Sequence, residues 1–123
     1  MKYKDENHDK YDRKLGKITD VKFGNGGYQD AQFGLTLTLE SKSGTGCGVF
    51  VCGGWNYSHI KHDSYCKWTE EDRTNGMAEM CREICRILHD AKVDTVDKLL
   101  GKPVEFATES FTLKSWRILE EVL

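Results

Sequence analysis

The most regular pattern in the chain is the alternation of apolar and polar residues in FGLTLTLE, residues 33–40. Leu35, Leu37 and Leu39 fall on one side of an extended segment, and polar residues fall on the other. This period of two predicts a strand with one buried face. KITDVKF (residues 17–23) is predicted to be the strand before it, and SKSGTG (residues 41–46) a turn. The next segment, CGVFVCGGW (residues 47–55), is apolar on both faces, which predicts a central strand.

A helical pattern follows Thr69. The residue types at Thr69 and Asp72 predict an N-cap and a variant capping box, with acidic residues in the first turn. Apolar residues then recur at spacings of three and four, which predicts one buried stripe: Met77, Met80, Cys81, Ile84, Leu88 and Ala91. A second, short helix is predicted for TVDKLL (residues 95–100), ending at Gly101. VEFAT (104–108) and LKSWRILEEVL (113–123) are predicted to be the last strands.

This order of elements predicts an α+β fold. We expect an antiparallel sheet of about five strands with one long helix between strands 3 and 4, as an OB-like barrel or a related small sheet, and a short second helix. At 123 residues the chain is long enough for one domain. Residues 1–16 mix both charges without any period, so we expect a flexible N-terminal arm followed by a single domain over residues 17–123.

The composition argues against some classes of function. Hydrophobic residues make up 38% and charged residues 31%, which is typical of a globular protein. A formal net charge of −2 argues against a strong, non-specific nucleic-acid binder, which depends on Lys and Arg. No apolar run approaches the ~20 residues of a membrane span, and the first residues have no secretory pattern. A cytosolic location is therefore expected, with the five cysteines as reduced thiols.

The glycine-rich stretch FGNGGYQDAQFG, residues 23–34, has two interpretations. A phosphate-binding loop would have to lead into a helix, whereas this stretch leads into a strand. We therefore predict a wide hairpin turn, with Gly24, Gly26 and Gly27 at positive φ. The side chains that follow, at residues 28–30, offer an aromatic ring, an amide and a carboxylate, so the tip of the turn is also a candidate binding site.

Metal binding and catalysis find less support. Seven Cys and His residues are possible metal ligands, if the N-terminal segment and the C-terminal end of the long helix are left aside: Cys47, Cys52, His59, His62, Cys66, Cys81 and Cys85. Their best cluster, residues 59–66, lacks a paired C-x-x-C, and Cys47 and Cys52 face opposite sides of a strand. No nucleophile or phosphate-loop signature is present. We assign no metal ligand, cofactor or catalytic residue and expect a protein that is not an enzyme. An accessory enzyme using Cys66 or His62 is the weaker alternative.

Aromatic and basic residues gather in and next to the expected loops. Aromatic rings stack on bases or on partner proteins, and basic groups hold phosphates. We hypothesise that the tip of the glycine-rich turn and the 55–68 connection form one recognition surface, with these ligand-binding residues: Asn25, Tyr28, Gln29, Asp30, Trp55, Tyr57, His62, Lys67 and Arg73. Trp68 or Trp116 is expected to be a core residue instead. Arg82 and Arg86 alternate with Glu79, Glu83 and Asp90, which indicates a solvated helix face.

Four stretches resemble a family of small proteins encoded by tailed phages and prophages. They are VKFGNGGYQDAQFGLTLTLE, CKWTEEDR, AKVDTVDKLLGKPVEF and LKSWRILEEVL, and the resemblance covers residues 17–123. GGYQDA and CKWTEEDR are its most specific parts. The family lends no catalytic residues. The resemblance implies a viral protein working in the cytoplasm of the infected bacterium.

In that setting our leading hypothesis is a non-catalytic binding protein that counters host defence. It would inhibit an immune effector, as an anti-CRISPR protein inhibits a CRISPR nuclease, or sequester a nucleotide second messenger. The alternative is an OB-like protein that binds single-stranded nucleic acid during phage replication. The expected partners are thus a host defence protein or a nucleotide, with nucleic acid as the other option and no membrane. A homodimer is compatible with the pattern, through a strand edge or a helix face.

Overall fold

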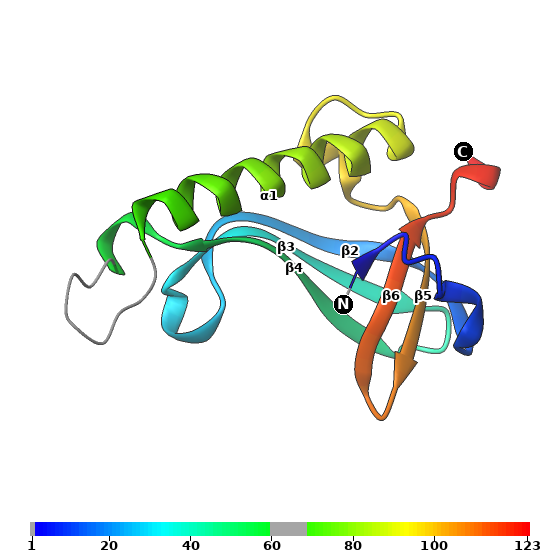
Figure 1. Ribbon diagram of the computed structural model, residues 1–123. Helices are drawn as coiled ribbons and strands as arrows, with labels where there is room; N and C mark the ends of the chain where they lie inside the picture. Colours follow the sequence, from blue (N-terminus) through cyan, green and yellow to red (C-terminus); the bar gives the residue numbers. More distant parts are fainter. Residues whose placement is uncertain (1, 60–68) are drawn as a thin grey trace.

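Figure 1 shows the computed structural model, which describes residues 2–59 and 69–123. Along the described chain the strands and the α-helix are β1 (Lys2–Tyr3), β2 (Arg13–Gly26), β3 (Gln32–Ser41), β4 (Gly46–Trp55), α1 (Glu70–Ala91), β5 (Pro103–Glu109) and β6 (Thr112–Ile118). Short 3-10 turns lie at His8–Lys10, Tyr28–Asp30, Tyr57–His59, Val96–Leu99 and Glu120–Val122. Strands β2 to β6 pair antiparallel, and α1 lies between β4 and β5. The predicted α+β fold is confirmed. The predicted short second helix is the 3-10 turn at Val96–Leu99.

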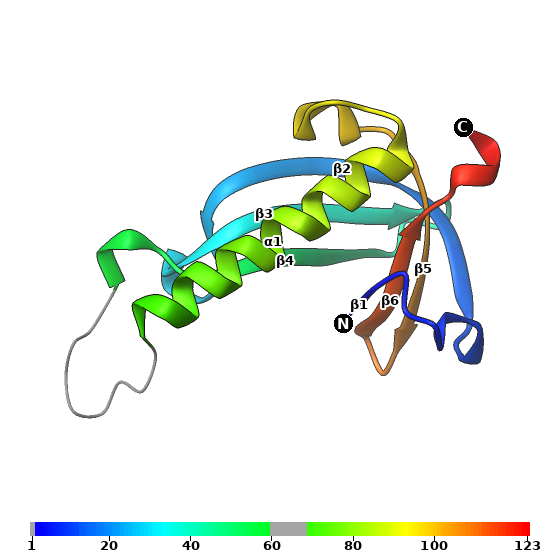
Figure 2. The ribbon, with the colours of Figure 1, turned by 45° about the horizontal axis from the view of Figure 1, so that its top comes forward.

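Strand β2 organises the sheet, whose order is β1-β6-β5-β2-β3-β4. Its first residues, 13–17, pair with β5, and residues 16–26 pair with β3, with a bulge between Ile18 and Asp20. Gly16 lies where the two pairings overlap, and a Cβ atom there would collide with the carbonyl oxygen of Glu40. A long first strand shared by both halves of a curved sheet, with a helix after the third strand, is the connectivity of an OB-type barrel (Figure 2).

The core lies between the curved sheet and α1. Its fully buried side chains include the leucines of β3 at positions 35, 37 and 39, as the alternation predicted. The helix approaches β4 closely because two glycines face each other: a Cβ atom on Gly76 would collide with the carbonyl oxygen of Gly53. The capping box is confirmed, since the Asp72 amide donates to Thr69 Oγ1 at 3.1 Å and the Thr69 amide to Asp72 Oδ2 at 2.8 Å.

Three details of the predicted elements are wrong. Cys81 is exposed, and Ile87 takes its place in the buried stripe of α1. Strand β4 is at the end of the sheet order instead of at its centre. Its apolar character has another cause: Val49 and Val51 face the core, while Phe50 on the other face packs against glycines. The last strand ends at Ile118, before the 3-10 turn at Glu120–Val122.

The predicted domain boundary at residue 17 is also wrong. β1 pairs in parallel with β6, and Tyr3, only 3% exposed, packs on Trp116 with 4.7 Å between the ring centroids. Residues 2–16 are therefore part of the domain where we expected a separate arm. The sequence did not predict this packing, because the segment contacts the domain through single residues that follow no periodic pattern. The fully buried Trp116 confirms one predicted core residue, whereas Trp68 lies outside the described residues.

Candidate binding surface at the loop end of the barrel

The β2–β3 connection is a wide hairpin turn, as predicted, with the 3-10 turn Tyr28–Asp30 between the two strands. Gly27 has φ of 70°, and Gln29 and Asp30, in the 3-10 turn, have φ of 54° and 53°. Gly24 also has positive φ, whereas the prediction for Gly26 is not met. Non-glycine residues in this region carry backbone strain unless the surrounding structure holds them there. Contacts outside the turn must therefore hold these residues in place.

Asn56 supplies those contacts. Its backbone amide donates to the carbonyl oxygen of Ala31 at 2.8 Å, and its side-chain amide donates to the carbonyl oxygen of Asp30 at 2.8 Å. The guanidinium of Arg73, on the first turns of α1, donates to the Asn56 carbonyl oxygen at 2.8 Å. One buried asparagine therefore joins the β2–β3 turn, the end of β4 and the start of the helix. Sequence reasoning missed Asn56, because a single Asn after a strand has no distinctive pattern.

We call this region the loop-end surface: residues 25–30, 55–57 and Arg73. Figure 1 shows the β2–β3 turn beside the exit of β4 and the start of α1. Tyr28 is 78% exposed and Tyr57 91% exposed, while Trp55, next to the Asn56 junction, is 38% exposed. Asn25, Gln29 and Asp30 are also exposed. The structure thus brings together the predicted residues of the turn and of the 55–57 segment, and His62 and Lys67 lie outside the described residues.

Arg73 has a different position from the one expected. Its side chain is mostly buried, donates to Asn56 and lies 3.7 Å from a carboxylate oxygen of Glu70. Such a guanidinium holds the loops in place and is poorly placed to meet a ligand directly. The described loop-end surface therefore offers aromatic rings and amides more than positive charge.

A shallow hollow of about 310 Å³ continues from Gly27 across the outer face of β3 and β4. Its floor is the ring of Phe50, with Thr36 and Gly48 beside it. Cβ atoms on Gly26 and Gly34 would lie 3.5 Å and 3.0 Å from that ring, so the glycines leave the phenyl group in contact with bare backbone. Several glycines of the opening stretch thus serve a packing role next to a half-exposed aromatic ring.

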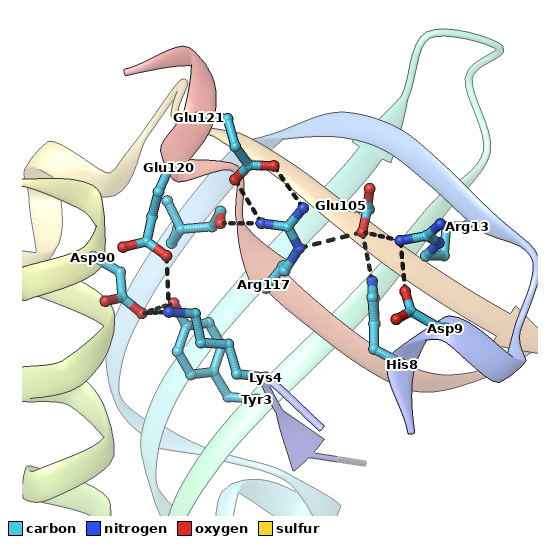
Figure 3. A network of polar contacts seen from close by, with 11 residues as sticks. Tyr3, Lys4, His8, Asp9, Arg13, Asp90, Glu105, Arg117, Glu120 and Glu121 are labelled. Atoms are coloured by element: carbon cyan, nitrogen blue, oxygen red, sulfur yellow. Dashed lines mark hydrogen bonds and ion pairs between the residues drawn. The ribbon is translucent and has the colours of Figure 1, made fainter. Parts of the chain in front are cut away.

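The opposite end of the barrel holds a polar network that ties the N-terminal segment to β5 and β6 (Figure 3). Glu105 Oε1 accepts from His8 Nε2 at 2.8 Å, from Arg117 Nε at 3.2 Å and from Arg13 Nη1 at 3.3 Å. Burial opposes ionisation of Glu105, but the hydrogen bond from His8 and the two guanidinium groups outweigh it and lower its pKa. Arg117 also holds Glu121, whose pKa falls to about 2 because of that hydrogen bond.

Asp90, on α1, ties the helix to the same N-terminal segment. Its carboxylate accepts from Tyr3 Oη at 2.6 Å and lies 3.1 Å from Lys4 Nζ. Burial and the bond to Asp90 raise the pKa of Tyr3; burial disfavours the charged Asp90, but bonds from Tyr3 and Lys4 lower its pKa overall. Arg86 lies over the Tyr3 ring, 5.6 Å from its centroid. The predicted solvated face of α1 is thus wrong for Asp90, which is buried, whereas Arg86 is exposed as predicted.

The network includes a Ser-His-carboxylate arrangement. Ser115 Oγ lies 2.7 Å from His8 Nδ1, and Glu105 lies on the other ring nitrogen. A nucleophilic serine must reach a substrate, and Ser115 is fully buried between β5 and the N-terminal segment. We therefore interpret this arrangement as a structural anchor. Within residues 2–59 and 69–123 no three side chains of the metal-ligating types His, Cys, Asp and Glu converge on one point.

No α-helix within the described residues is long and apolar enough to span a bilayer. Searches of protein-family models, curated proteins and solved structures found no match to this chain. The resemblance to the phage family therefore stays a hypothesis that depends on the motifs quoted above.

Proposed function

We propose that this protein is a non-catalytic binding protein that uses the loop-end surface to inhibit a partner protein. The observation that carries the proposal is the pair of nearly fully exposed tyrosines, Tyr28 and Tyr57, on loops that Asn56 holds together. Tyr and Trp supply large contact areas at little cost in side-chain entropy, and Asn, Ser and Gly supply adaptable hydrogen bonds. The described surface has this composition, which is typical of protein-binding loops.

The partner follows from the setting that the phage resemblance implies. In an infected bacterium, a small binding protein of this kind would counter host defence by covering the working surface of an immune effector, such as a CRISPR nuclease. A nucleotide second messenger is the other ligand for the same rings, since aromatic groups also stack on bases. The aromatic rings and amides of the described surface favour the protein target.

A pull-down from lysate of the bacterial host tests this proposal. The bait proteins are the wild type, Tyr28→Ala/Tyr57→Ala and Phe111→Ala, the last removing an exposed aromatic residue outside the loop-end surface. We expect the wild type and Phe111→Ala to retain the same protein and the double variant to lose it. The captured protein, identified by mass spectrometry, should lose activity when purified wild type is added. Retention by the double variant would contradict the proposal.

A second candidate function is binding of single-stranded nucleic acid on the outer face of β3 and β4. The observation that favours it is the OB-type strand order together with the Phe50 hollow, because OB barrels bind strands on this face and stack bases on aromatic rings. It predicts affinity for an oligonucleotide that falls steeply with salt. Phe50→Ala should then weaken oligonucleotide binding by about 1–3 kcal/mol. Tyr28→Ala/Tyr57→Ala should abolish only the complex with the partner protein. Fluorescence anisotropy with a labelled oligonucleotide at two salt concentrations separates the two candidates.

A further inference from the structure

The hairpin between β5 and β6 exposes an aromatic residue that contributes nothing to the fold. Its two turn residues, Ser110 and Phe111, have φ of 50° and 66°, in the left-handed region. Tight hairpin turns of this kind favour Gly, Asn and Asp, since a larger side chain is strained there. Phe111 nevertheless occupies the strained position with a relative exposure of 104%. The strained backbone under this bulky, wholly exposed ring points to a contact outside the chain's own core.

The same chain has a groove of matching character. It encloses about 560 Å³ and lies between the first half of β2, the end of β3 and the C-terminal 3-10 turn. Leu15 and Val122, 52% and 64% exposed, lie on its walls with Pro103 and Leu119. Here too the described structure leaves apolar side chains in contact with water. A phenyl ring is small enough to enter the groove and would cover these side chains.

The charges of the two features are complementary. Exposed Lys17 and Lys42 line the groove together with Glu40, which gives an excess of positive charge. Glu109, exposed, precedes the turn that holds Phe111. The acidic residues near the C-terminal wall already have cationic partners, Glu120 with Lys4 and Glu121 with Arg117. An incoming hairpin with one carboxylate next to its aromatic tip therefore meets lysines at the rim.

We propose that the groove receives Phe111 from a second copy of this chain, so that the protein self-associates through a hairpin-into-groove contact. Hairpin and groove are different surfaces of the molecule, so each copy offers one of each. Two copies related by a two-fold axis can make the contact twice, whereas a single contact leaves one hairpin and one groove open to further copies. This association is independent of the loop-end surface and of the function proposed for it.

Sedimentation equilibrium of the full chain over a wide range of concentrations tests the proposal. We expect the wild type to associate reversibly and Phe111→Ala to raise the dissociation constant by about tenfold or more, because a phenyl ring is no longer buried. Phe111→Gly should weaken association equally while raising the melting temperature, since glycine relieves the turn. Tyr57→Ala is the matched control, because it removes an equally exposed ring from the loop-end surface and should leave association unchanged.

Two complementation experiments locate the contact. Leu15→Glu should block the groove. A mixture of Phe111→Ala with Leu15→Glu should recover one contact, visible as a heterodimer at concentrations where each variant alone is monomeric. Glu109→Lys should weaken association, and combining it with Lys17→Glu/Lys42→Glu should restore it. A wild type that is monomeric at every concentration would overturn the proposal. So would an unchanged dissociation constant for Phe111→Ala, or a mixture that stays monomeric.

Discussion

The two ends of the barrel use their side chains in opposite ways. At the end formed by the termini, carboxylates, guanidinium groups, a histidine and a tyrosine bond to one another around the buried carboxylates of Glu105 and Asp90. At the loop end, aromatic side chains are exposed, and one buried asparagine bonds to the backbone of Asp30 and Ala31. The first arrangement stabilises the fold, whereas the second fixes the shape of loops and leaves their side chains available. A dense polar network is therefore a poor guide to a candidate binding surface.

Removing Glu105, at the end formed by the termini, should lower the free energy of unfolding more than any substitution at the loop end. Glu105→Ala leaves His8, Arg13 and Arg117 without their shared acceptor, although each keeps another partner, and we expect a loss of about 2–3 kcal/mol in the free energy of unfolding. Urea denaturation measures this loss. Glu109→Ala, on the same strand but exposed, is the matched control and should change stability by less than about 0.5 kcal/mol. Equal effects of the two substitutions would show that the network is not stabilising.

At the loop end the strongest effect should come from Asn56. Asn56→Ala removes the bond to the Asp30 carbonyl but leaves the backbone bond to Ala31, so we expect a loss of about 1–2 kcal/mol. Asn25→Ala, at an exposed position, should be near neutral. Hydrogen exchange gives a second measurement: the amides of residues 27–31 should exchange faster in Asn56→Ala, with β5 and β6 unchanged. Uniform acceleration across the sheet would contradict the local role of Asn56.

Acid should weaken the terminal end before the loop end. The pKa values of Glu105 and Asp90 are lowered in the folded state, so the stability they contribute is present above the ordinary carboxyl pKa and is lost as the pH falls below about 4. Protonation keeps the shape of the side chain, so the loss should be smaller than on deletion. We expect the free energy of unfolding to fall less steeply with acid in Glu105→Gln than in the wild type. Identical slopes would exclude Glu105 as a contributor.

The smallest effect on stability is expected for the residues that we assign to binding. Tyr28→Ala and Tyr57→Ala remove side chains that bury little surface, so each should shift the free energy of unfolding by less than about 0.5 kcal/mol. Thermal denaturation of both variants checks this. A large loss in either would mean that its ring packs on the fold, and the loop-end surface would then lose that member.

Periodic features could be predicted from the sequence and isolated ones could not. The alternation around Leu37 and the capping box at Thr69 each repeat a local rule, so strand β3 and the start of α1 were found. Tyr3 and His8 bury themselves against β6, far away in sequence, and no local pattern records such a contact. The turn residues Tyr28 and Asp30 were found as candidates from their neighbours in the chain. Asn56, which holds the turn, was missed because its partners are defined only by the fold.

The pairing of β1 with β6 has a consequence for how the chain folds during synthesis. His8 and Ser115 are 107 positions apart, and Tyr3 packs on Trp116. The residues that leave the ribosome early must therefore wait, without their partners, until β6 has been translated. Contacts of such long range are slow to form, because the loop they close is costly in entropy. The barrel can begin to assemble from β2, β3 and β4 during translation, but its core closes only after β6 has emerged.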